Sequence, residues 1–190
     1  GSSSGSGAAM SLRLASLAVG TETNGSIICP ASINGVVGFK PTVGLLSRTH
    51  IVPISFSQDT AGPMTANVHD AWLMTAIMAG VDEEDNATKD AQSYIPKLPS
   101  ASMLATDLKG KRIGVVRYRQ GDNPHVLAVY EKALAQLKAS GATLVDISDF
   151  SQPDSFWADS YNVLLSEFHH SINDYLAGSP AELPARNLDE

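Results

Sequence analysis

The loop TETNGSI, residues 21–27, places a serine where its hydroxyl could act as a nucleophile. Amide hydrolysis by serine needs an attacking hydroxyl, a group that takes its proton, and N–H donors for the developing oxyanion. Asn24 and Gly25 tolerate the backbone angles that turn successive N–H groups toward one point. Ser26 and the backbone before it could therefore supply nucleophile and donors. A serine in front of an apolar run with a proline also fits a plain helix cap, so the loop alone leaves both interpretations open.

The chain opens with a second serine-rich stretch, GSSSGSG, which we call the Gly/Ser segment, residues 1–7. Its first five residues match the G-x-S-x-G pattern of a nucleophile elbow with Ser3 at the centre, but an elbow needs a strand in front of it. A Gly/Ser run is also typical of a flexible linker or an expression remnant. Short patterns of this kind match easily, so the segment decides nothing by itself.

The remaining chemistry-bearing residues do not predict a metal site. No H-x-x-x-H pair occurs among the five histidines, which are His50, His69, His125, His169 and His170. The acidic run 82–85 lacks the spacing of a calcium loop and is expected to be a solvated connection. Cys29 is the only cysteine, can form no internal disulfide, and is expected to be a small buried residue. We therefore expect neither a metal nor a cofactor, and the compartment stays open between cytoplasm and periplasm.

Composition limits the partners. The 190 residues carry a formal net charge of -7 and no basic run, which argues against a nucleic-acid surface. No stretch approaches the roughly 18 consecutive apolar residues of a membrane span. We expect no nucleic-acid partner and no membrane partner.

Glycine and proline divide the first half of the chain into short elements. Residues 8–19 predict a helix that gives way to a short buried strand near Val19, followed by a polar loop over 20–26. A short helix is expected from Ser26, and a strand over 35–39. The rest of this half is expected to be loop-like over 43–66 and helical over 67–79, with Asn67 and Asp70 as caps and Gly80 as the stop.

The second half has a different pattern. An acidic connection is expected over 81–108, followed by a strand, a helix and a second strand within 112–149. Such a crossover favours a parallel strand pair in a layered α/β fold. A last amphipathic helix is expected over about 155–177.

Taken together, three segments resemble the amidase signature family. They are GSSSGSGAA, GTETNGSIICPASINGVVGFKPTVGLLSR and IVPISFSQDTAGPM, and the likeness runs from residue 1 to about 80. The resemblance implies an α/β fold, layered α/β/α with a mixed central sheet, of which this chain is a fragment. It implies a single domain over 1–190, incomplete at both ends. In that domain 1–80 is the signature core, 81–108 a connection, and 109–190 a β-α-β unit plus a helix.

Family members use a Ser–Ser–Lys triad, and the motif positions carry it onto this chain. The resemblance implies that Ser26 is the nucleophile and that Ser2, 24 residues earlier, is the serine with a cis peptide bond, supported by Ser3. It implies an oxyanion hole made by the backbone N–H groups of the loop, which are those of Thr23, Asn24, Gly25 and Ser26. The catalytic lysine is expected upstream of residue 1, in the remainder of the same chain, while Lys40 is expected to be structural.

The implied function is an amidase that hydrolyses small-molecule or peptide carboxamides through an acyl-enzyme. The loop departs from the common Gly-Gly-Ser-Ile-Arg of the family, because Asn24 and Ile28 stand at its first and last positions. The loss of the arginine removes a bidentate carboxylate partner. The Thr-Glu-Thr and Ile-Cys-Pro-Ala variants, residues 21–23 and 28–31, most resemble the bacterial peptide-amidase branch. Two alternatives stay open. One is the glutaminase subunit of a tRNA-dependent amidotransferase, and the other is a catalytically inactive scaffold.

Overall fold

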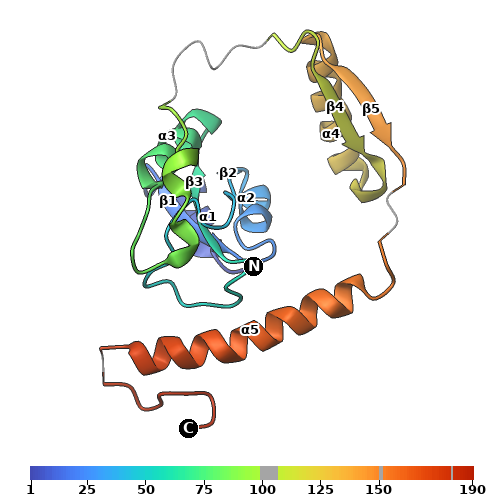
Figure 1. Ribbon diagram of the computed structural model, residues 1–190. Coiled ribbons are helices and arrows are strands. Elements are labelled where there is room, and N and C mark those ends of the chain that lie inside the picture. The colour runs from blue at the N-terminus through green and yellow to red at the C-terminus, as the bar shows by residue number, and fades with distance from the viewer. Residues whose placement is uncertain (99–106, 150–151, 181) are drawn as a thin grey trace. The chain divides into compact units, whose positions relative to one another are not determined.

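The computed structural model describes residues 1–98, 107–149, 152–180 and 182–190 (Figure 1). It divides into two compact units. The first comprises Gly1–Pro99 together with Trp157–Glu190, and the second comprises Ser100–Phe156. The first unit contains an antiparallel sheet and the second a parallel strand pair, so the α/β fold class is confirmed. The expectation that all these parts form one domain, divided at 80 and 108, stays a prediction.

A three-stranded sheet with the order β1-β3-β2 organises the first unit. Both neighbours of the central strand run antiparallel to it. The strands are β1 (Ala18–Glu22), β2 (Val37–Gly38) and β3 (Thr60–Thr65). Around the sheet lie α1 (Ser4–Ser11), α2 (Ile28–Asn34) and α3 (Val68–Met78). The predicted strand near Val19 therefore runs further than expected, through Glu22.

The central strand β3 lies inside 43–66, so the prediction of a loop for all of that segment is wrong. Gly62 and Pro63 make this strand difficult to predict from the sequence, because both residue types usually interrupt a strand. Pro63 has no N–H to donate, but its carbonyl still accepts from Phe39 N at 3.1 Å, just beyond the end of the short strand β2. Gly62 is required because a Cβ there would lie 2.2 Å from the Phe39 carbonyl oxygen. All six residues of β3 are buried.

A small apolar cluster holds α1 and α2 on the sheet. It consists of four buried residues, Met10, Ile27, Ala31 and Met64. Ile27 and Met64 are fully buried, which stabilises the fold by roughly 1.5–3 kcal/mol for each side chain. Because Ile27 directly follows Ser26, the core fixes the end of the loop that carries this serine.

Helix α1 begins earlier than the composition suggests, because it includes part of the Gly/Ser segment. Glycine disfavours helices in isolation. Here the close approach to α2 requires it, since a Cβ on Gly7 would lie 3.0 Å from Asn34 Nδ2 and 3.3 Å from the Pro30 carbonyl oxygen. The interpretation of this segment as a flexible linker or expression remnant is therefore wrong.

The second unit confirms the predicted β-α-β crossover. Strands β4 (Arg112–Val116) and β5 (Thr143–Ile147) pair in parallel, and α4 (Pro124–Ala139) connects them. A short 3-10 helix, η4 (Arg117–Arg119), follows β4. The Asn123 side chain caps α4 by accepting from the backbone N–H groups of residues 125 and 126.

The other predicted helices are also present. Asn67 caps α3 by accepting from Asp70 N at 2.9 Å, and the helix ends shortly before Gly80. Helix α5 (Phe156–Gly178) matches the last expected helix closely. The expected connection over 81–108 contains the 3-10 helices η1 (Asn86–Thr88) and η2 (Ala91–Tyr94), while its part 99–106 lies outside the described residues. Within the described ranges, no helix is both long and apolar enough to span a bilayer.

Candidate active site

Strand β1 fastens the Gly/Ser segment to the loop that carries Ser26. The Ser3 hydroxyl donates to the Thr21 carbonyl oxygen at 3.2 Å and accepts from Thr21 N at 3.1 Å. Ser6 donates to the Val19 carbonyl oxygen at 2.8 Å. Residues 23–26 contain the nucleophile that the sequence predicts, and we call them the nucleophile loop. This loop begins directly after β1 ends at Glu22. The two serine motifs of the sequence are therefore held together by the same strand.

The turn at Ser2 and Ser3 has a constrained backbone. Ser3 has φ 57°, a left-handed value that costs energy in a residue other than glycine and persists only where its surroundings impose it. Its two hydrogen bonds to Thr21 supply that constraint. A nucleophile at an elbow needs a hydroxyl that is free to attack, whereas both bonds of Ser3 use its hydroxyl to hold strand β1. The nucleophile-elbow interpretation of Ser3 therefore has no support in the described structure.

Ser2 precedes this turn and is exposed. All peptide bonds of the described residues are trans, so the cis bond implied for Ser2 is not found. The trans form is the low-energy state of a bond between non-proline residues. Among the described residues, no hydrogen bond joins the Ser2 and Ser26 hydroxyls. The structure thus brings their two segments together at Thr21 but does not show the serine–serine contact.

Ser26 is half-buried at the end of the nucleophile loop, and it does not cap the following helix. Gly25 has φ 101°, which confirms that the loop needs a glycine there. Helix α2 begins at Ile28, and its cap position is occupied by Ile27 without any side-chain cap. The helix-cap interpretation of Ser26 is therefore wrong.

Glu22 performs the capping instead. Its carboxylate Oε2 accepts from Ile27 N at 2.7 Å and from Ile28 N at 2.9 Å, and the residue is only 4% exposed. A carboxylate at a helix N-terminus satisfies N–H groups that have no partner inside the helix and interacts favourably with the helix dipole. As a result the Ser26 hydroxyl is not used to hold its own loop. Sequence reasoning missed Glu22 because it stands five positions before the amide that it binds, outside the usual capping patterns.

A second buried carboxylate holds the start of the nucleophile loop. The Thr23 hydroxyl donates to Asp59 Oδ1, while Asp59 Oδ2 accepts from Ile54 N at 2.7 Å and from Ser55 N at 2.8 Å. Asp59 is 7% exposed. In the sequence it was only part of the D-T-x-G-P-M segment, and nothing in its local pattern indicated Thr23 as its partner.

The four residues expected to form the oxyanion hole lie in the bend between β1 and α2. The amides that Glu22 binds begin only at Ile27, so this carboxylate does not occupy the amides of the nucleophile loop. The bend is thus held at both ends by acidic side chains, by Asp59 through Thr23 and by Glu22 through the start of α2.

Two other sequence expectations have clear outcomes. Lys40 Nζ donates to the Gln58 carbonyl oxygen at 3.3 Å, which agrees with a structural role.

Cys29 is exposed, so the prediction of a buried cysteine is wrong. The buried positions here are Ile27, Pro30 and Ala31, whose helical spacing leaves Cys29 on the opposite side. Among the described residues, no group of three His, Cys, Asp or Glu side chains could hold a metal ion.

The acidic run 82–85, which we call the acidic turn, is not simply solvated. Asp82 accepts from the Ser47 and Thr49 hydroxyls, each at 2.5 Å, and these bonds lower the pKa of Asp82 to about 2. Asp85 pairs with Arg48 at 2.7 Å, and the guanidinium hydrogen bond holds the pKa of Asp85 below its usual range. The expectation of a solvated connection is therefore wrong for these two residues.

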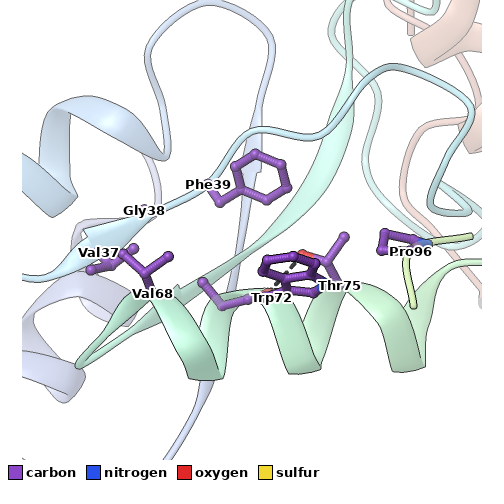
Figure 2. Close-up of a pocket in the computed structure, with 8 residues that line it drawn as sticks. Val37, Gly38, Phe39, Val68, Trp72, Thr75 and Pro96 are labelled. Carbon is purple, nitrogen blue, oxygen red and sulfur yellow. Dashed lines mark hydrogen bonds between the residues drawn. The ribbon is translucent and has the colours of Figure 1, made fainter. Parts of the chain in front are cut away.

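An apolar groove of about 330 Å³ lies between β2 and α3. Figure 2 shows the Phe39 and Trp72 rings facing it, with Val37 and Val68 at one end and Pro96 at the other. None of the serine-site residues lines this groove. Its lining carries no charged group, and its one hydroxyl, that of Thr75, donates to the Ala71 carbonyl oxygen at 2.7 Å, so the candidate chemistry is sought at the nucleophile loop.

Comparisons with known proteins bear on the family of the chain. A family model described as Amidase matches residues 1–189. The native peptide amidase from Stenotrophomonas maltophilia superposes with a TM-score of 0.83 at 42% identity, over 100% of this chain and 38% of its own. A structure of the peptide amidase PAM with the competitive inhibitor chymostatin gives a TM-score of 0.85 at 42% identity, with the same coverage.

A second kind of relative is similar over a shorter range. A glutamyl-tRNA(Gln) amidotransferase subunit from Ruegeria sp. (strain TM1040) is 46% identical over 150 residues, which are 78% of this chain and 30% of the relative. The chain spans about a third of the length of the curated relatives it matches.

Proposed function

This chain belongs to the amidase family, and from that premise we propose that it carries the nucleophile of a serine amidase. Ser26 attacks a carboxamide carbonyl, Ser2 relays the proton, and the backbone N–H groups of Thr23, Asn24, Gly25 and Ser26 bind the oxyanion. The lysine that completes the triad comes from the remainder of the same chain. The substrate is a small-molecule or peptide carboxamide, and the products are a carboxylic acid and ammonia or an amine.

The main support for this proposal is the way in which Glu22 holds the start of α2. Glu22 binds the two amides at the start of α2, so the Ser26 hydroxyl is left out of the scaffold that holds it. A serine kept only for structure would be expected to make that cap itself. Support also comes from the Ser3–Thr21 contacts, which fix the segment of Ser2 to the same strand.

The reaction needs a proton relay and one acyl intermediate. As Ser26 Oγ bonds to the carbonyl carbon, its proton passes to Ser2, whose own proton passes to the neutral lysine amine. The C–N bond then breaks while the relay returns a proton to the leaving nitrogen. Water attacks the resulting ester and releases the acid. The N–H donors contribute because they are already oriented toward the developing negative charge, and each such donor is worth about 3–4 kcal/mol in known serine enzymes.

The side chain of Ile28 favours a substrate that carries an uncharged group, rather than a carboxylate, beside the scissile amide. It stands where the family loop commonly has arginine, and its side chain is 52% exposed. An arginine would bind a substrate carboxylate through two parallel hydrogen bonds, whereas isoleucine offers only apolar contact. The peptide amidase relatives act on peptide amides by name, and one binds the competitive inhibitor chymostatin. Peptide amides are therefore the first substrates to test.

The test is ammonia release by the natural full-length chain from a panel of peptide amides and simple primary carboxamides. We expect release by the wild type and background release by Ser26→Ala. The matched control is Ser32→Ala, because Ser32 is exposed on the helix that follows the nucleophile loop. Activity that survives in Ser26→Ala would contradict the assignment of the nucleophile.

The second candidate is the glutaminase subunit of a tRNA-dependent amidotransferase, favoured by the 46% identity to the amidotransferase relative from Ruegeria. Glutamine hydrolysis that depends on co-purified subunits would support it over the peptide amidase. An inactive scaffold is the third outcome. It would show no ammonia release from any amide and no labelling of Ser26 by a fluorophosphonate probe.

A further inference from the structure

We propose that Asp59 is a positioning residue for the nucleophile loop, acting through the hydroxyl of Thr23. This inference rests on the proposed function, because it assigns Asp59 a role in holding the oxyanion donors of that same site. Asp59 would touch neither the substrate nor the reacting atoms.

The register of the sheet places the two residues opposite each other. Strands β1 and β3 pair antiparallel up to Glu22 and Thr60. One step further along an antiparallel pair, Thr23 faces Asp59. At this step the backbone ladder has ended, and the hydrogen bond from the Thr23 hydroxyl to Asp59 Oδ1 takes its place. Asp59 thus holds Thr23, the first residue of the loop, where the backbone hydrogen bonds of the sheet have ended.

Asp59 is itself held firmly. Its other oxygen accepts two backbone N–H groups, from Ile54 at 2.7 Å and from Ser55 at 2.8 Å. A carboxylate that accepts several N–H bonds in a buried place keeps one orientation, since each bond is strengthened by its charge. The two donor sets use different oxygens, so Asp59 bridges the 54–55 backbone and the nucleophile loop at once.

Ser55 is anchored from a distant part of the first unit. It is fully buried, and its hydroxyl donates to Glu167 of α5, which also accepts from the Ser57 hydroxyl at 2.9 Å. Burial opposes the charged form of Glu167, but the hydrogen bonds from Ser55 and Ser57 prevail and lower its pKa. Glu167 is therefore ionised at neutral pH. The chain of contacts runs from Glu167 through Ser55 and Asp59 to Thr23.

Such anchoring matters because N–H donors act only when they already point at the oxyanion. A displacement of about 1 Å at a reacting group can cost on the order of 100-fold in rate. Loss of the Thr23 hydroxyl should let the start of the loop move while the loop end stays fixed by Glu22 and the buried Ile27. The expected result is lost transition-state stabilisation rather than lost substrate binding.

The experiment compares Thr23→Val, Thr23→Ser and Asp59→Asn in the natural full-length chain on a peptide amide. We expect kcat to fall on the order of 10- to 100-fold in Thr23→Val with KM nearly unchanged, and to recover in Thr23→Ser, which keeps the hydroxyl. In Asp59→Asn a single amide oxygen must accept from both the Thr23 hydroxyl and the backbone N–H groups of residues 54 and 55, so this variant should also lower kcat. The double variant Thr23→Val, Asp59→Asn should be no slower than Asp59→Asn alone, because both changes break the same contact.

The matched control is Thr49→Val, since Thr49 also donates its hydroxyl to a carboxylate, that of Asp82, and among the described residues it has no hydrogen bond with the nucleophile loop. It should keep the wild-type kcat. If Thr23→Val and Thr49→Val both keep kcat while Ser26→Ala loses it, the inference about Asp59 is wrong and the proposed function stands.

Hydrogen exchange supplies a readout that does not depend on activity. Thr23→Val should raise amide exchange in residues 23–26 relative to wild type, with exchange in the second unit unchanged. If the wild type hydrolyses no amide, the proposed function fails, and the exchange result still decides whether Asp59 positions the loop. Unchanged exchange in residues 23–26 would overturn the inference.

Discussion

Two serines of the first unit lie in loops held by buried or half-buried carboxylates, and they are used differently. Ser47 donates its own hydroxyl to Asp82 and so helps to fasten the acidic turn. Among the described residues the Ser26 hydroxyl makes no hydrogen bond that holds its loop, while Glu22 and Asp59 hold the neighbouring residues. A serine thus becomes available for chemistry when other groups hold the structure around it.

The acidic turn differs from the nucleophile loop in one respect, because one of its carboxylates also binds a cation. Asp85 of the acidic turn binds the guanidinium of Arg48. Glu22 and Asp59 bind neutral groups, which are backbone amides and one hydroxyl. Substitutions in the nucleophile loop and in the acidic turn can test this contrast.

The largest effect is expected from removing the hydroxyl of each serine in turn. Ser26→Ala should reduce amide hydrolysis to background with little change in Tm. Ser47→Ala should keep kcat and lower Tm, because it removes a hydrogen bond that holds the acidic turn. Kinetics and thermal unfolding of the full-length chain measure both. Equal effects of the two variants on kcat would contradict the distinction between Ser26 and Ser47.

The next largest effect is expected at Glu22. Glu22→Ala leaves two N–H groups at the start of α2 without their acceptor, at a cost of roughly 1–3 kcal/mol for a buried donor. The free energy of unfolding in urea should fall by about 2 kcal/mol, and kcat should fall with it because the end of the nucleophile loop is released. Glu83→Ala is the control, since Glu83 is exposed in the acidic turn and surface changes usually stay within about 0.5 kcal/mol.

A smaller effect, confined to stability, is expected at Asp85. Asp85→Asn weakens the hold on Arg48, whose side chain is only 17% exposed. Hydrogen bonds between charged groups contribute about 1.5–3 kcal/mol, so unfolding in urea should shift by about that amount. We expect kcat to stay close to the wild-type value, because no contact of Asp85 reaches residues 23–26 among the described residues. A kcat loss as large as that of Glu22→Ala would remove the distinction between the two loops.

The smallest effect is a pH dependence of stability. The pKa of Asp82 is lowered to about 2 by Ser47 and Thr49, and hydrogen bonding to Arg48 lowers that of Asp85. With a folded pKa below the unfolded one, the unfolded chain binds more protons between the two values, so stability rises with pH there. The contribution is complete above the ordinary aspartate pKa and is lost as pH falls toward about 2.

Asp82→Asn tests this sign. Its unfolding free energy should depend less steeply on pH between about 4 and 2 than that of the wild type, as measured by urea unfolding at a series of pH values. A slope identical to that of the wild type would show that Asp82 does not contribute to acid sensitivity.

The parts of the fold with a clear period could be predicted from the sequence. The β-α-β unit and helices α3 and α5 follow from alternation, helical spacing and caps such as Asn67 and Asn123. Strand β3 could not be predicted, because Gly62 and Pro63 are placed by what they touch across the sheet. A periodic sequence pattern predicts hydrogen bonding between residues that are near in the chain. A close contact between segments that are distant in the chain produces no such pattern.

The candidate site shows the same division. The sequence by itself determined that Ser2, Ser3 and Ser26 belong to spaced motifs of one family and that the loop before Ser26 needs a glycine, since these depend on residue type and spacing. Only the tertiary structure decided that Ser3 binds Thr21, that Glu22 rather than Ser26 caps α2, and that Asp59 holds Thr23. The physical reason is that a carboxylate selects its donors by position in space. Residues 36 apart in the chain meet only because β1 and β3 pair in one register.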